Sequence, residues 1–244
     1  AENKTQKDND YLVKSVRESG LTVSEVLLQH DLVVIDQAQR KANVRLICEN
    51  IKKVADIGAD TVNVFTGPVP WMPDSISVGK QVSAGDAWKW TFQAFDDILP
   101  VAEKCGVRVA VENVWGMLVH DFYTNKYLQA KFPSENLGVN LDPSHDVLYG
   151  NTDMRFLVNG WGKEKIFHVH VKDAVGVAEP GKFVFPVIGE GNVNFTEFFG
   201  ALKDTGYNGT ASVEFESWAY RNTVWDGKHA PSAPAMRKIL DKYL

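Results

Sequence analysis

The chain has 244 residues, of which 44% are hydrophobic and 23% are charged, and its formal net charge is −5. This composition excludes an intrinsically disordered chain, because it supplies enough apolar side chains for a sizeable core. The acidic balance and the lack of a lysine and arginine block argue against nucleic acid as a partner.

Short β-branched runs alternate along the chain with helical patterns, which is typical of parallel βαβ units. The first helix is expected over DNDYLVKSVRESG, residues 8–20, and further helices over 37–57, 86–105, 195–205 and 231–243. The predicted strands are, in chain order, 21–28, 61–67, 107–114, 137–142, 165–173, 183–189 and 210–217.

These strands number seven, one fewer than a closed barrel needs. The length is close to the roughly 250 residues of an α/β barrel, so we expect one domain over residues 1–244, a (β/α)₈ TIM-like barrel. Its first strand is missing or atypical, because only the polar residues 1–9 precede the first helix. An unpaired barrel edge exposes backbone donors and acceptors, so we expect an oligomer or an inserted strand to cover it.

The cysteines and the N-terminal residues bear on location. Cys48 and Cys105 lie on different predicted helices with no second thiol nearby, which argues against a disulfide framework or a zinc knuckle and favours the cytoplasm. No window approaches the roughly 18 apolar residues of a membrane span, and AENKTQKDND is polar throughout. We therefore expect neither export nor insertion into a membrane.

Polar residues gather where the predicted strands end. In IFHVHVK an ideal strand would place Ile166, His168, His170 and Lys172 on one face and Phe167, Val169 and Val171 on the other. The outward face of a barrel strand packs on helices, and the inward face at its carboxyl end opens into the active site. His170 and Lys172 are therefore expected at the barrel mouth, together with acids that end other strands: Glu112, Asp142, Glu214 and Glu216.

Carboxylates around one mouth repel each other unless they are protonated or neutralised, and a divalent cation neutralises them. Glu112, Asp142, His170 and Glu214 would offer three oxygen ligands and one nitrogen. This mixture suits Mn²⁺ first, then Mg²⁺ or Co²⁺, rather than a closed structural zinc site. The alternative is that each acid caps a helix or pairs with a lysine.

Two side chains beside these ligands are candidates for contact with a substrate. His145 follows Asp142 by three residues and is expected to reach the substrate. Lys172 either steadies a developing alkoxide or enolate, or pairs with Glu216 or Asp173.

Two tryptophans follow the ends of predicted strands, and three further histidines lie elsewhere in the chain. Trp71 and Trp115 either stack on a sugar ring or pack in the core. His168 is expected to be buried and hydrogen-bonded, whereas His30 and His120 are expected to be ordinary loop histidines.

Five motifs occur in an order that resembles the xylose isomerase-like barrels, in the sugar isomerase and epimerase branch related to endonuclease IV. They are VAVEN (109–113), GVNLDPSHD (138–146), HVHVKD (168–173), GEGNVNF (189–195) and SVEFE (212–216). The resemblance spans roughly residues 20–220. It implies that Glu112, Asp142, His170 and Glu214 bind one divalent metal, that His145 lies close to the substrate, and that the two glutamates face opposite sides of a sugar carbon.

The sequence also departs from this family. Ketose epimerases usually place an arginine shortly after the strand-six histidine, and here Lys172 is the nearest cation. With the atypical first strand, this departure points to a specialised branch that works with a smaller subunit, such as the larger subunit of the C-glycoside deglycosidases. Substrate placement cannot be copied from the family.

The expected function is metal-dependent isomerisation or epimerisation of a sugar or keto-sugar, with Glu112 and Glu214 as acid and base. The alternative is a lyase that eliminates an aglycone from a 3-keto glycoside, with His145 as general acid or base. DNA repair of the endonuclease IV kind is disfavoured by the acidic chain and its 6 histidines. A catalytically silent scaffold is disfavoured by the intact ligand set.

Overall fold

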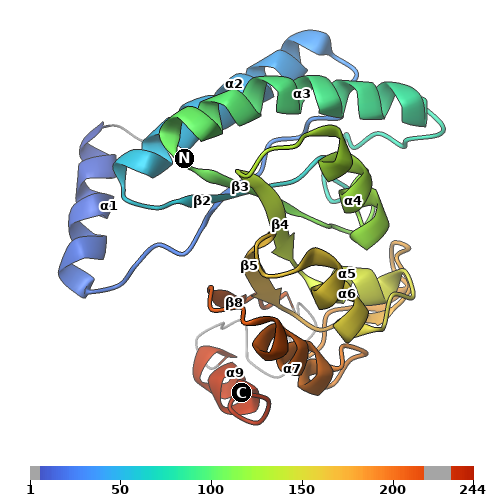
Figure 1. Ribbon diagram of the computed structural model, residues 1–244. Coiled ribbons are helices and arrows are strands. Elements are labelled where there is room, and N and C mark those ends of the chain that lie inside the picture. Colours follow the sequence, from blue (N-terminus) through green and yellow to red (C-terminus); the bar gives the residue numbers. More distant parts are fainter. Residues whose placement is uncertain (1–5, 217–231) are drawn as a thin grey trace.

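The computed structural model describes residues 6–216 and 232–244, and its main feature is a curled parallel sheet that forms a half-barrel (Figure 1). The sheet has six strands in the order β1-β2-β3-β4-β5-β8. The predicted α/β, TIM-like fold is confirmed. The strands are β1 (Val26–Leu28), β2 (Thr61–Val64), β3 (Arg108–Glu112), β4 (Leu137–Leu141), β5 (Ile166–Val171) and β8 (Ala211–Val213).

Helices follow the strands and cover the outer face of the curled sheet (Figure 1). Helices α2 and α3 pack against each other over β2 and β3, and α6 packs against α7 near β5. The described helices are α1 (Gln6–Ser19), α2 (Gln37–Asp56), α3 (Ala84–Cys105), α4 (Phe122–Lys131), α5 (Pro143–Leu148), α6 (Met154–Trp161), α7 (Phe195–Thr205) and α9 (Ser232–Leu240). None of them combines the length and the apolar character that crossing a membrane requires.

The apolar core lies between the sheet and these helices. Ile47 of α2 and Ile98 of α3 pack with Val62 and Val109 of the sheet, and all four are fully buried. The helix ends follow from local chemistry: the Asp36 side chain accepts the N–H groups of Ala38 and Gln39 at the start of α2. Helix α3 ends at Gly106, whose φ of 66° is a left-handed conformation that favours glycine.

The strand count from sequence was wrong in one place. Residues 183–189 form no barrel strand: β7 (Phe183–Val184) pairs antiparallel with β6 (Val175–Gly176) in a separate two-stranded sheet. Pro186 lies two residues after β7 and lacks the N–H that a longer ladder would need. The predicted strand 21–28 is also shorter than expected, because only its last three residues pair with β2.

A register shift in β5 overturns part of the expected alternation. Val139 pairs with Ile166 and Asn140 with His168, so Phe167 is skipped between them. Ile166 consequently packs on the helix side with Val169, and does not share the inward face of His168.

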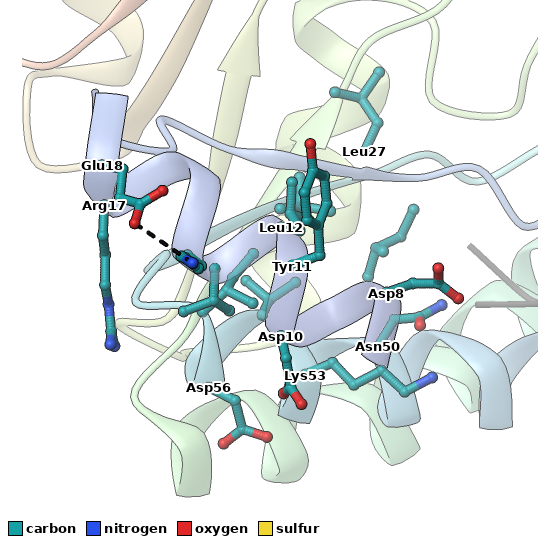
Figure 2. A pocket seen from close by; sticks show the side chains of 16 residues that line it. Asp8, Asp10, Tyr11, Leu12, Arg17, Glu18, Leu27, Asn50, Lys53 and Asp56 are labelled. Atoms are coloured by element: carbon teal, nitrogen blue, oxygen red, sulfur yellow. Dashed lines mark ion pairs between the residues drawn. The ribbon is translucent and has the colours of Figure 1, made fainter. Parts of the chain in front are cut away.

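The half-barrel is open beside β1. In the described sheet β1 pairs with β2 alone, and a cavity of about 960 Å³ lies between β1, α1 and α2. Figure 2 shows Tyr11 and Leu12 of α1 and Leu27 of β1 among the side chains that line it. The described residues thus contribute six of the eight strands of a closed barrel.

Candidate functional site

The carboxyl ends of four strands bring four side chains together. Glu112 ends β3, Asp142 directly follows β4, His170 lies on β5 and Glu214 directly follows β8. One ligand atom of each lies within 4.8 Å of the corresponding atoms of the other three. These are the four residues that the sequence nominated as metal ligands, and three of them are almost fully buried, with Glu214 partly so.

Two cationic side chains neutralise these carboxylates. Nδ1 of His170 lies 3.0 Å from Oε1 of Glu112 and 3.2 Å from Oε2 of Glu214. Nζ of Lys172 lies 2.6 Å from Oε2 of Glu214 and 3.0 Å from Oδ2 of Asp142. The site is therefore a buried cluster of alternating charges.

The pKa values follow from this arrangement. Burial alone would lower the pKa of His170, but the charge of Glu112 and its hydrogen bonds to carboxylates raise that pKa well above its ordinary value. The pKa of Lys172 is likewise raised by Asp142 and Glu214 against the effect of burial. Burial would raise the pKa of Glu214, yet Lys172 and His170 hold it well below the usual range.

The donor set fits a divalent ion. Three carboxylates outnumber the two cationic side chains, His170 and Lys172, by one negative charge, and the ligand atoms are close enough to share one cation. Oxygen-rich sites with one nitrogen suit hard or borderline divalent metals. The cluster can thus hold a metal ion.

His145 lies in the same cluster. Its Nε2 is 3.1 Å from Nζ of Lys172 and 3.5 Å from Oδ2 of Asp142, and its Nδ1 accepts the backbone N–H of Trp115 at 3.3 Å. Burial and the neighbouring charge of Lys172 lower the pKa of His145 to about 3, so the ring is neutral near pH 7. It is a neutral imidazole within reach of the same charged groups.

The two tryptophans lie in different surroundings. Trp115 is half-buried, and its ring centre is 4.7 Å from that of Phe183 in β7. Trp71 is 50% exposed, packs edge-on against Phe65 and lines a cavity of about 310 Å³. None of the four clustered side chains lines that cavity. The structure therefore brings Trp115, but not Trp71, next to His145.

The other polar residues of β5 have clear partners. His168 is buried, as expected, with Nδ1 3.2 Å from Oδ1 of Asn140 and Nε2 3.0 Å from Oγ of Ser212. Lys172 does pair with Glu216, at 3.3 Å. Asp173 is not its partner: both of its oxygens accept backbone N–H groups, including those of Gly189 and Gly191 in GEGNVNF.

Two further histidines in the described part of the chain, His30 and His120, lie outside the cluster. His120 stacks on Tyr149 and bonds the carbonyl of Met117 in a loop, and His30 lines the cavity beside Trp71.

Sequence reasoning missed two residues that hold the cluster. The Asn63 side chain donates to Oε2 of Glu112 at 2.7 Å, and Oε1 of Glu25 lies 2.7 Å from Nε2 of His170. Asn63 could have been found, because the alternation in TVNV places it on the inward face of β2. Glu25 was not nominated, because it falls inside the predicted strand 21–28 rather than at its carboxyl end, and the structure places it directly before β1.

Comparison with known proteins gives one family. The model of the family described as "Xylose isomerase-like TIM barrel" matches residues 2–239. An uncharacterised protein of Methanocaldococcus jannaschii, MJ1311, is 26% identical over 216 residues. That match covers 86% of this chain, but the chain spans only 65% of the length of that relative.

Solved structures share the fold at low identity. A crystal structure of IolI protein with a bound zinc atom superposes with a TM-score of 0.75 and 17% identity, covering 97% of this chain and 82% of the other. A D-tagatose 3-epimerase-like protein superposes with a TM-score of 0.73 and 21% identity, covering 98% of this chain and 83% of the other.

Proposed function

The chain belongs to the xylose isomerase-like TIM barrel family, and from this premise we propose that it is a metal-dependent isomerase or epimerase of a sugar or keto-sugar. The observation that carries the proposal is the convergence of Glu112, Asp142, His170 and Glu214 within 4.8 Å. The fold shared with a D-tagatose 3-epimerase-like protein supports a carbohydrate as the substrate class.

Glu112, Asp142, His170 and Glu214 would hold one divalent ion, and we propose Mn²⁺ because carboxylates outnumber imidazoles among the ligands. When bound, such an ion supplies a Lewis acid that polarises the carbonyl group of the substrate. Zinc is the competing choice, because IolI carries it on the same fold.

The reaction we propose is a proton transfer beside the carbonyl. One of the two glutamates, Glu112 or Glu214, removes the proton from the carbon next to the carbonyl, and electron density moves to the carbonyl oxygen. The other glutamate, which enters the step protonated, returns its proton to the same carbon from the opposite face, which inverts that carbon and leaves the first glutamate protonated. If the proton is returned to the former carbonyl carbon instead, and the neighbouring hydroxyl passes its proton to the former carbonyl oxygen, the product is an isomer with the carbonyl moved by one carbon.

Four further side chains would position the substrate. The ammonium of Lys172 would offset negative charge on a substrate oxygen, and neutral His145 can hydrogen-bond a hydroxyl. Trp115 would pack an apolar face of the sugar beside His145. Trp71, in the loop after β2, would contact a more distant part of the substrate.

Elimination is the second candidate, and the place of His145 inside the cluster favours it. Its Nε2 lies 3.1 Å from Nζ of Lys172, where the ring could exchange a proton with an aglycone that departs from a 3-keto glycoside. Because the pKa of His145 is lowered to about 3, this role requires the substrate to change the charges around the ring. This lyase would use the same cluster, together with a smaller partner subunit, and would differ in its product.

The experiment is proton exchange in D₂O. Protein loaded with Mn²⁺ is incubated with ketoses and 3-keto-sugars, and deuterium at the carbon next to the carbonyl is measured by mass spectrometry and NMR. We expect exchange that E112Q and E214Q each slow by at least about 100-fold. The matched control E164Q changes an exposed glutamate and should leave the exchange rate unchanged.

The outcomes separate the candidates. Exchange with return of an epimer or isomer supports the proposal, whereas release of an aglycone from a keto-glycoside supports elimination. Absence of exchange with every substrate, or an unchanged rate in E112Q, would contradict proton transfer by this cluster.

A further inference from the structure

Carboxylates contact both ring nitrogens of His170. Nδ1 faces Glu112 and Glu214, whereas Nε2 lies 2.7 Å from Oε1 of Glu25. Glu25 stands directly before β1, 145 residues away in the sequence, and its side chain is as deeply buried as that of His170. It is a further carboxylate at the site, in addition to Glu112, Asp142, Glu214 and Glu216. It lies on the Nε2 side of the His170 ring, whereas the other ligand atoms lie on the Nδ1 side.

The contact between Glu25 and His170 decides which hydrogen the imidazole keeps when an ion binds. An ionised carboxylate can only accept, so with carboxylates at both ring nitrogens His170 carries a hydrogen on each of them. A cation held by Glu112, Asp142 and Glu214 would displace the hydrogen of Nδ1, and the short contact to Glu25 would keep the hydrogen of Nε2 in place. Metal-binding histidines commonly donate their second N–H to a carboxylate in this way.

A second ion between Glu25, His168 and His170 is the competing interpretation, because their ligand atoms also lie within 4.8 Å of one another. The partners of His168 argue against it. Its Nε2 lies 3.0 Å from Oγ of Ser212, and its Nδ1 lies 3.2 Å from both Oδ1 of Asn140 and Oε1 of Glu25. Nδ1–H of His168 can therefore be donated to either of these oxygens without an ion between them. His170 would also have to serve both ions.

We propose that Glu25 is a positioning residue of the candidate metal centre. It accepts a hydrogen bond from Nε2–H of His170 and thereby fixes the ring with Nδ1 toward the ion held by Glu112, Asp142 and Glu214. This inference rests on the metal site of the proposed function. It adds a residue that makes no direct contact with the ion and is supplied by the segment before β1.

Titration calorimetry with Mn²⁺ alone tests the affinity. We expect one ion per chain for the wild type, with an affinity that E25A weakens about 10- to 100-fold. E25Q should fall between them, because its amide oxygen can still accept from Nε2–H. The control E18Q changes a glutamate that is 67% exposed on α1 and should stay within about twofold of the wild type.

NMR of the Zn²⁺-loaded protein with ¹⁵N-labelled histidine tests the mechanism. Two-bond ¹H–¹⁵N spectra should show His170 with its hydrogen on Nε2 and the metal on Nδ1 in the wild type. In E25Q the Nε2–H resonance of His170 should shift, because a neutral amide replaces the carboxylate, and the signals of His168, whose Nδ1 lies 3.2 Å from Glu25, should shift with it. The signals of His120 and His145, which have other partners, should keep their positions. This measurement needs only the milder variant, so it holds even where E25A fails to fold.

Three results would overturn the inference. Unchanged Mn²⁺ affinity in E25A and E25Q, with the wild type binding one ion, would remove Glu25 from the centre and leave the proposed function intact. Two ions in the wild type and one in E25A would make Glu25 a ligand of a second ion. A wild type that binds no ion would overturn the metal site itself, and the positioning role with it.

Discussion

Asp146 is a fully buried carboxylate that ties together the loops around the site. Its Oδ1 accepts the backbone N–H of Phe122 at 2.9 Å, and its Oδ2 accepts the Asn113 side chain at 2.9 Å. Burial nevertheless raises its pKa from 3.8 to about 7, because those hydrogen bonds only partly offset the loss of water. Asp146 therefore couples the stability of the fold to pH.

The substitution D146N should remove that coupling. Between about pH 3.8 and 7 the folded protein keeps the Asp146 proton while the unfolded chain releases it. The stability that this group contributes is thus fully present below pH 3.8 and is lost as the pH rises through 7. Asparagine does not titrate, so raising the pH across this window should lower the wild-type free energy of unfolding, relative to D146N, by up to about 4 kcal/mol.

Urea unfolding of both proteins at several pH values between 4 and 7.5, with EDTA present, measures this difference. A difference in the free energy of unfolding that is the same at every pH would show that Asp146 is ionised throughout.

The four clustered residues could be nominated from the sequence because each lies at the end of a strand. The carboxyl ends of neighbouring parallel strands meet at one rim, so Glu112, Asp142 and Glu214 had to approach each other once the strands were recognised. Glu25 could not be found in this way. The sequence predicts a strand over 21–28 with Glu25 in its interior, whereas in the structure residues 21–25 pair with no strand and lead Glu25 to His170 by an irregular path.

At the scale of elements, the pairing of β4 with β5 is the clearest departure from ideal periodicity. The sequence period of two assigns Ile166 and Phe167 to the wrong faces, because the register skips Phe167. Gly138 of β4 allows this close approach. A Cβ at that position would lie 2.6 Å from the carbonyl oxygen of Lys165 and 2.6 Å from the Phe167 ring.

The substitution G138A should therefore destabilise the protein. The backbone oxygen of Lys165 cannot move without disturbing the β4–β5 ladder, so we expect a loss of about 1–3 kcal/mol in the free energy of unfolding. The control is G85A in α3, where the nearest atom to an added Cβ is Ser83 Oγ at 3.9 Å. Alanine in a helix should be neutral there or stabilise by up to about 1 kcal/mol.

Urea denaturation at one pH compares the two variants with the wild type. Equal stability of G138A and G85A would show that β4 and β5 can separate enough to admit a methyl group.

The long helices α2 and α3 were predictable, because their apolar periodicity is sustained and each has a capping residue or a terminal glycine. The hairpin of β6 and β7 was not. Its strands have two residues each, and a run such as FVFPVIG has the same composition as a buried barrel strand. A hairpin strand and a barrel strand differ only in the strand with which they pair, and the residues of a short strand do not by themselves predict that partner.

At the scale of the whole molecule, the candidate site adds side-chain links between strands that already pair with their neighbours through backbone hydrogen bonds. Its ligands come from β3, β4, β5 and β8, which are successive neighbours in the half-barrel. A cation that binds all four would link the middle of the sheet to its β8 edge. It would also offset the repulsion among buried carboxylates that Lys172 neutralises only in part.

Metal should therefore stabilise the entire half-barrel. A ligand present at about 100 times its Kd and bound only by the folded state adds about 2.7 kcal/mol to the free energy of unfolding. For a chain of this length, each kcal/mol raises Tm by about 2–4 °C, so Mn²⁺ should raise Tm by about 5–10 °C and EDTA should reverse the rise.

In E214Q, which removes the ligand from the β8 edge, the rise should be smaller, whereas the surface variant E164Q should respond like the wild type. Calorimetry with and without Mn²⁺ measures these shifts. A Tm that does not respond to any divalent ion would mean that the four side chains are held by Lys172 and His170 alone, and that the cluster is a structural network of ion pairs rather than a metal centre.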